Sequence, residues 1–256
     1  MSSRKNIKSY KILGCRVSDC TAIELNEYIL NIVRNNLKEP ILNVNINCMN
    51  LAQKHSWLKT FLNDTNIVFC DGDGVRLGAK IKGIDIPEKI TYNRWIWQLA
   101  NVSIDNNLSW YLFGGKDDII KQSKEVLKAR YPKLNVKGYR SGYFDFKNDT
   151  PEIIDEINRN KPNILVLGMG MPLQEKWIIE NLDKINVNVV LTGGAVFDYI
   201  SGNAKMTPEF YFNYKIEWLY RLMNDPIRLF NRYIIGNPLF LFRVILEKYR
   251  IFNYNI

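Results

Sequence analysis

Two aspartates in a short glycine-rich turn, Asp71-Gly72-Asp73-Gly74, are the strongest candidates for chemistry in this sequence. Two neighbouring carboxylates can shift each other's pKa values, which suits Asp71 to act as a general base and Asp73 to bind a substrate. The same spelling is also typical of an ordinary turn. Asp-x-Asp resembles a divalent-metal motif, but no third carboxylate stands at a clear spacing, so we expect no metal site.

Polar or glycine-rich residues also follow four other short apolar runs. Glycine lets the backbone approach a ligand, and a helix that begins after it offers free N–H groups to phosphate. Such loops suit a nucleotide diphosphate. We predict that the following residues bind substrate: Asn43, Asn45, Gly114, Gly168, Gly170, Gly193 and Gly194.

Two of the glycine motifs depart from familiar nucleotide fingerprints. Gly168-Met169-Gly170 does not complete G-x-G-x-x-G because residue 173 is leucine, which counts against NAD. Gly114-Gly115-Lys116 is either a ligand loop or a plain turn, and it lacks the spacing of a P-loop ATPase. We therefore expect no cofactor. Pro172 is placed to start a helix that presents Gln174 to the ligand, where its amide could bind a uracil or a sugar hydroxyl.

Six short apolar runs must position these residues. They are 41–46, 67–70, 110–113, 136–139, 164–167 and 187–191, and most of them are followed by a helix-like stretch. Strands that are apolar on both faces and return through helices predict a mainly parallel sheet covered on both sides. The expected class is a Rossmann-like α/β domain over residues 1–203, with its ligands at the carboxyl ends of the strands.

The composition changes after residue 203. Residues 204–256 hold 13 of the 32 aromatic residues, with eight Lys or Arg and four Asp or Glu. We predict a helical appendage that associates with a membrane surface. Arg221, Arg228 and Arg232 would bind a diphosphate or a lipid headgroup, although pairing with Glu217 and Asp225 on a helix surface is the plainer interpretation.

The overall composition fits a folded protein with an anionic partner. The 256 residues include 35 Lys and Arg against 26 Asp and Glu, a net charge of +9. Nucleic acid, a phosphorylated metabolite and an anionic membrane all fit this charge. The chain has four cysteines without a CxxC pair and one histidine, His55, too few ligands for a Cys/His zinc site. It has no uncharged apolar run of 18 residues, so we expect no membrane-spanning segment.

Taken together, the motifs resemble the WecG/TagA/CpsF family of bacterial glycosyltransferases. The resemblance rests on 42–45 (LNVN), 71–75 (DGDGV), 168–177 (GMGMPLQEKW), 193–198 (GGAVFD) and 217–222 (EWLYRL), with Asp225-Pro226-Ile227-Arg228 and Arg232-Tyr233 after them. These motifs span most of the chain in the family's order.

The resemblance implies an inverting, metal-independent transfer of a sugar from a UDP-sugar to a polyprenyl-diphosphate-linked sugar, in cell-wall or surface-polysaccharide synthesis. The sugar would be N-acetylmannosamine or a related hexose or uronic acid. In this family Asp71 matches the proposed base, and Asn45 and Gln174 match substrate-contacting positions. The appendage matches one that completes the site at the cytoplasmic face of the membrane. Self-association is also plausible, because exposed apolar residues of the appendage need cover in water.

Three positions depart from the family pattern. Asn43 stands where members usually have threonine, Tyr92-Asn93-Arg94 replaces Gly-x-Asp, and Asn231 stands where an arginine is expected. We hypothesise that Arg94 binds a different donor sugar, such as an acidic one. A noncatalytic protein that binds a lipid carrier and a nucleic-acid-binding module are the alternative classes; the glycine-rich strand ends disfavour nucleic acid.

Overall fold

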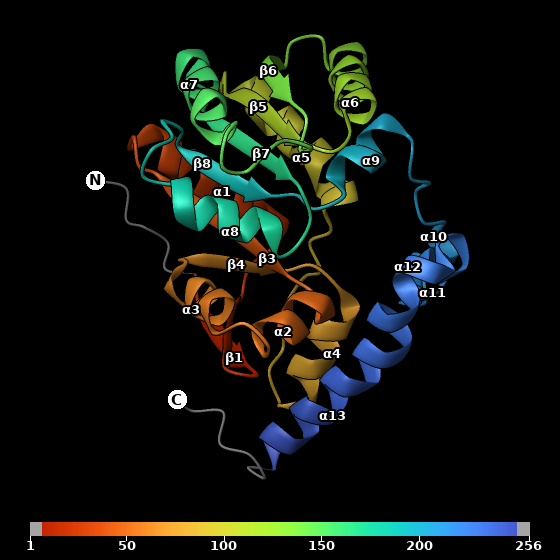
Figure 1. The fold of residues 1–256 in the computed structure, drawn as a ribbon. Helices are drawn as coiled ribbons and strands as arrows, with labels where there is room; N and C mark the ends of the chain where they lie inside the picture. The colour runs from red at the N-terminus through yellow and green to blue at the C-terminus, as the bar shows by residue number, and fades with distance from the viewer. Residues whose placement is uncertain (1–6, 250–256) are drawn as a thin grey trace.

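A six-stranded parallel sheet forms the centre of the computed structural model, which describes residues 7–249 (Figure 1). Its strands lie in the order β4-β3-β8-β7-β5-β6, and every neighbouring pair is parallel. They are β3 (Glu39–Val44), β4 (Ile67–Cys70), β5 (Ser109–Gly114), β6 (Asn135–Arg140), β7 (Ile164–Gly168) and β8 (Val189–Thr192). Each predicted run overlaps one strand, so the Rossmann-like α/β prediction is confirmed. The first run was predicted too long, because Asn45 and Ile46 belong to the start of the next helix.

Helices cover both faces of the sheet, which explains why its inner strands are apolar on both faces over most of their length. In β7, Leu165 and Leu167 belong to one core, whereas Ile164 and Val166 belong to the other. The first core is covered by α2 (Ile46–Ala52), α3 (Ser56–Asp64), α4 (Asp73–Ile81), α7 (Thr150–Asn160) and α8 (Leu173–Asn181). The second is covered by α1 (Ala22–Arg34), α5 (Tyr92–Asp105), α6 (Asp117–Arg130) and α9 (Val196–Ser201).

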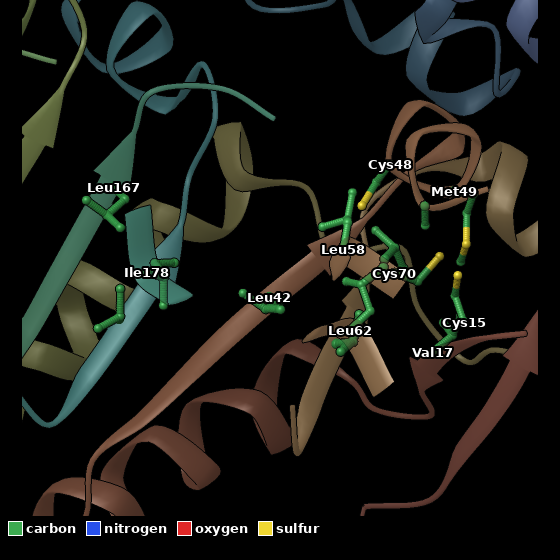
Figure 2. Packing of buried hydrophobic residues seen from close by; sticks show 14 of the residues in the cluster. Cys15, Val17, Leu42, Cys48, Met49, Leu58, Leu62, Cys70, Leu167 and Ile178 are labelled. Atoms are coloured by element: carbon green, nitrogen blue, oxygen red, sulfur yellow. The ribbon is translucent and has the colours of Figure 1, made fainter. Parts of the chain in front are cut away.

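An N-terminal hairpin, which the sequence analysis did not predict, extends the first core. Strands β1 (Ser9–Ile12) and β2 (Cys15–Ser18) pair antiparallel, and the Ser18 hydroxyl accepts the Val68 N–H at 2.9 Å. Figure 2 shows Cys15 and Val17 of this hairpin beside Met49 and Cys70. The four cysteines are buried and free, and burial raises the pKa of the Cys15 thiol to about 11. These thiols therefore pack as small apolar groups.

The C-terminal segment is helical, as predicted, and its last helix packs on the body. It comprises α10 (Glu209–Asn213), α11 (Glu217–Asn224), α12 (Pro226–Phe230), a π-helical stretch η1 (Asn231–Ile235) and α13 (Gly236–Lys248). Phe240 and Val244 of α13 are fully buried in the first core, against Gly78 of α4 (Figure 1). The boundary between residues 203 and 204 stays a prediction.

Candidate active site

A cavity of about 490 Å³ lies where β3 and β4 end, between α4 and the C-terminal segment. Five of the predicted site residues line it: Asn45, Asp71, Asp73, Arg221 and Arg232. Two come from the strand ends and a third begins α4, whereas the two arginines come from α11 and η1. Other lining residues include Ile46, Arg76, Leu77, Lys80, Thr91, Glu217, Trp218, Tyr233 and Leu241. The cavity therefore combines acids, cations and apolar surface.

Asp71 is held in the cavity from the sheet side. It follows β4 directly, and its N–H donates to the Val44 carbonyl at 2.9 Å. The Asn43 amide nitrogen donates to Asp71 Oδ2 at 2.9 Å. Gly72 then turns the chain into α4. Its φ of +148° is a backbone conformation that residues other than glycine rarely adopt. Asn43 is buried and touches Asp71 from behind instead of lining the cavity.

The charges around Asp71 suit a group that takes up a proton. Burial raises the pKa of Asp71 above its ordinary value. Arg221, the Asn43 amide and Arg232 act against this rise, whereas the Glu217 carboxylate adds to it. A carboxyl with a raised pKa is a stronger base than an ordinary aspartate, which fits general-base chemistry.

Asn45 and Asp73 each have a defined partner within the protein. The Asn45 side-chain oxygen accepts the Cys48 N–H at 3.1 Å and so caps α2. Asp73 Oδ2 accepts from Lys89 Nζ at 2.6 Å. Asp73 is therefore neutralised by a cation that the sequence analysis did not select.

Lys89 belongs to a charge network that joins the body to the C-terminal segment. Its ammonium also lies 3.5 Å from Glu217 Oε2, and Glu217 Oε1 accepts from Arg221 at 2.6 Å. Burial alone would raise the pKa of Glu217, but Arg221 and Lys89 hold that pKa below its usual value. The network thus places Arg221 beside the cavity.

The predicted glycines lie at strand ends outside the cavity lining, and they divide into two kinds. A Cβ on Gly114 would come within 2.4 Å of the Gly168 backbone, one on Gly168 within 2.4 Å of the Phe197 ring, and one on Gly193 within 2.6 Å of the Val196 side chain. These three glycines are required by close packing against neighbouring backbone or side chains. Gly170 and Gly194 have φ of +79° and +57° and open space where a Cβ would lie. Only these last two leave room for a ligand to approach.

Gln174 does not face the cavity. Its side chain is fully buried, its amide nitrogen donates to Glu175 Oε1 at 2.8 Å, and its oxygen accepts the Gly194 N–H at 3.0 Å. The amide therefore connects α8 to the loop after β8. Burial raises the pKa of the adjacent Glu175 to about 7. In this structure the nitrogen and the oxygen of the Gln174 side chain both form hydrogen bonds within the protein. The contact of Gln174 with substrate therefore stays a prediction.

Two predicted arginines also lie outside the cavity. The Arg94 guanidinium is 3.7 Å from the centre of the Phe212 ring, and Lys89 Nζ is 3.8 Å from the same centre. Arg228 is exposed and donates to Asp225 at 2.5 Å. This is the pairing on a helix surface that the sequence also allowed for this arginine. The role of Arg94 in donor choice stays a prediction, and its observed contact is with α10.

The C-terminal segment exposes a broad apolar surface. It includes Phe210, Tyr214, Trp218, Met223, Ile227, Phe230, Ile234, Ile235, Phe242 and Ile245. By length and composition alone, the helical stretch Pro226–Lys248 is long and apolar enough to cross a membrane, and 22% of its most apolar window is buried. It contains arginines, which explains why a search for uncharged runs did not select it. Within residues 7–249, no three His, Cys, Asp or Glu side chains are grouped to hold a metal ion.

Comparison with known proteins confirms the resemblance seen in the motifs. Residues 10–253 match the model of the family described as "Glycosyl transferase WecG/TagA/CpsF family". Relatives from Staphylococcus aureus strains MW2, NCTC 8325 / PS 47 and MRSA252 are each 25% identical over 264 residues, which covers 98% of this chain and 98% of each relative. All three are named N-acetylglucosaminyldiphosphoundecaprenol N-acetyl-beta-D-mannosaminyltransferase.

Proposed function

Because this chain belongs to the WecG/TagA/CpsF family of glycosyltransferases, we propose that it transfers N-acetylmannosamine, or a related sugar, from a UDP-sugar to a polyprenyl-diphosphate-linked N-acetylglucosamine. The names of the staphylococcal relatives support this acceptor and this sugar. The product would be a lipid-linked disaccharide for a cell-wall or surface polysaccharide.

The observation that best supports this function is the position of Asp71 in the cavity. Asp71 accepts a hydrogen bond from Asn43, and Arg221 and Arg232 lie close enough to lower its pKa. Asp71 takes the proton from the acceptor hydroxyl while that oxygen attacks the anomeric carbon. UDP leaves from the opposite face of the sugar, which inverts the anomeric centre. The two arginines offset the negative charge of phosphate groups, so that the proposed reaction proceeds without a metal ion.

The deciding experiment measures UDP release from a panel of UDP-sugars with a short-chain polyprenyl-diphosphate-N-acetylglucosamine acceptor, with and without EDTA. We expect release with one donor, unchanged by EDTA, and a loss of roughly 10² to 10⁴ in kcat for Asp71→Asn. The exposed Asp118 on α6 gives a matched control, since Asp118→Asn leaves the cavity untouched. Undiminished turnover in Asp71→Asn would reject this aspartate as the base.

We also propose that the C-terminal segment attaches the enzyme peripherally to the inner face of the cytoplasmic membrane. The exposed apolar surface and the +9 charge support attachment to anionic lipid. Deleting the segment is a poor test, because it would also remove Phe240 and Val244 from the core. Ile227 is 95% exposed, so Ile227→Glu removes apolar surface without disturbing packing.

We expect Ile227→Glu to weaken binding to anionic liposomes about tenfold, the equivalent of one buried aliphatic side chain. The matched control is Ile23→Glu on α1, where the isoleucine is 71% exposed. Equal liposome binding by both variants would contradict attachment through the C-terminal segment.

A further inference from the structure

Behind Asp71, three side chains form a buried line across three neighbouring strands. Thr192 ends β8, Asn43 lies in β3, and Asp71 follows β4, in the spatial order β4-β3-β8. The Thr192 hydroxyl donates to Asn43 Oδ1 at 2.9 Å, and Asn43 Nδ2 donates to Asp71 Oδ2 at 2.9 Å. Thr192 is fully buried and Asn43 is 4% exposed, so water does not substitute readily for either bond.

The chemistry of the three groups allows one arrangement when Asp71 is ionised. A carboxylate only accepts hydrogen bonds, so the nitrogen of the Asn43 amide must face Asp71. The amide oxygen then faces Thr192, whose hydroxyl must donate. The carboxylate thus sets the orientation of the amide, and the Thr192 hydroxyl holds the amide oxygen in place from the other side, although Thr192 does not line the cavity.

We propose that Thr192 is a positioning residue for sugar transfer, because it holds the Asn43 amide so that Asp71 keeps one carboxylate oxygen turned toward Asn43 and the other available to the acceptor hydroxyl. The inference rests on the proposed role of Asp71 as the base. It adds a residue from a third strand, one with no contact to substrate.

The same line sets part of the acidity of the base. Donation from Asn43 lowers the pKa of Asp71 against the effect of burial. The other groups that act on Asp71 or are acted on by it are Arg221, Glu217, Arg232, Tyr199, Tyr92, Cys70 and Cys48. Of these groups only Tyr92 also interacts with the Thr192 hydroxyl, so a substitution at Thr192 leaves the others in place. If the Asn43 amide rotates away, the pKa of Asp71 rises, and the acidic limb of the pH profile of kcat moves to higher pH.

Thr192→Val removes the hydroxyl at nearly constant shape, and Thr192→Ser keeps it. We expect Thr192→Val to lower kcat about tenfold, which is only part of the effect expected from losing the general base itself. KM should change little, and the acidic limb of the pH profile of kcat should move to higher pH. Thr192→Ser should restore both the rate and the pH profile. Wild-type kcat and pH profile in Thr192→Val would overturn the proposal.

A double-mutant cycle with Asn43→Ala tests whether Thr192 acts through Asn43. In that background we expect Thr192→Val to have no further effect on kcat, whereas independent, multiplying losses would overturn the proposal. Thermal unfolding and circular dichroism establish that each variant is folded, and Thr192→Ala replaces Thr192→Val in the cycle if the valine variant does not fold. Asp71→Asn, assayed alongside, reports separately on the proposed function: if it stays active, Asp71 is not the base.

Discussion

The two ends of the C-terminal segment are attached to the body by different kinds of interaction. Helix α13 is attached by burial: Phe240 and Val244 are inaccessible, and a Cβ on Gly78 would come within 2.8 Å of the Phe240 ring. The part from α10 to α11 is attached by charges and rings, through Glu217 with Lys89 and through Phe212 with Arg94. Apolar burial is non-directional and is not screened by salt, whereas ion pairs are weakened by salt and by competing anions, and the less so the more buried they are.

This difference matters because the cavity lies against the charged attachment. Glu217, Arg221 and Arg232 line it, and a phosphate entering it competes for the same cations. Helix α13 is thus held by burial, whereas this wall of the cavity is held by ion pairs with which the phosphate groups of the proposed substrates would compete.

Phe240→Ala should have the largest effect on stability. Removing a fully buried phenylalanine costs about 3–5 kcal/mol in the free energy of unfolding, through lost burial and the cavity left behind. Urea denaturation measures this cost, and Phe242→Ala, at a side chain that is 58% exposed, is the matched control. Similar losses in the two variants would mean that α13 is not attached by burial.

Glu217→Gln should have the next largest effect. It breaks the pairs with Arg221 and Lys89, and we expect a loss of about 2 kcal/mol in unfolding free energy at low salt, less than for a wholly buried pair. The loss should shrink in high salt, unlike that of Phe240→Ala. The exposed Glu209 of α10 supplies the control Glu209→Gln. A cost independent of salt would argue against a charged attachment.

Arg94→Ala should cost about 1 kcal/mol, the size of a cation–π contact at a partly exposed site. Arg94→Lys keeps the positive charge and should lose less. Unfolding measurements give these costs, and the UDP-sugar panel applied to the same variants tests donor choice. A changed donor preference with unchanged stability would favour the sequence-based hypothesis for Arg94 over its contact with Phe212.

The smallest expected effect is a dependence of stability on pH. Because its partners hold the pKa of Glu217 below the ordinary value, its contribution is fully present above that ordinary value and is lost as the pH falls through the folded-state pKa. The difference in unfolding free energy between the wild type and Glu217→Gln should therefore shrink on acidification. A difference that grows as the pH falls would contradict this assignment of charge.

The sheet and the centre of the site could be predicted because parallel strands bring their carboxyl ends to one edge. Asp71 and Asn45 follow adjacent strands, so their convergence requires only the right strand order. The hairpin was missed because its turn places Leu13 at φ of +52°, where Asn or Gly is the usual signal.

The partners of each site residue could not be predicted in the same way. Whether Gln174 reaches a ligand or the Gly194 N–H depends on how far two loops approach, which residue types do not determine. Lys89 stands in a stretch between α4 and α5 with no periodic pattern, so nothing local indicates that it pairs with Asp73. The pairing of Lys89 with Asp73 follows from the way the fold brings two opposite charges together, and this can be seen only once the fold is known.

The docking of α13 has a consequence for the order in which the chain folds. Glu247, near the C-terminal end of α13, accepts the Leu13 N–H at 2.9 Å and lies 2.9 Å from Lys82. The hairpin turn therefore gains this hydrogen bond only from a residue 234 positions later in the chain. During synthesis the N-terminal portion emerges first, and the surface of α4 around Gly78 stays uncovered until α13 is made. Contacts of such sequence separation form late and slow folding, so the nascent protein exposes this apolar surface to chaperones and to other chains before α13 covers it.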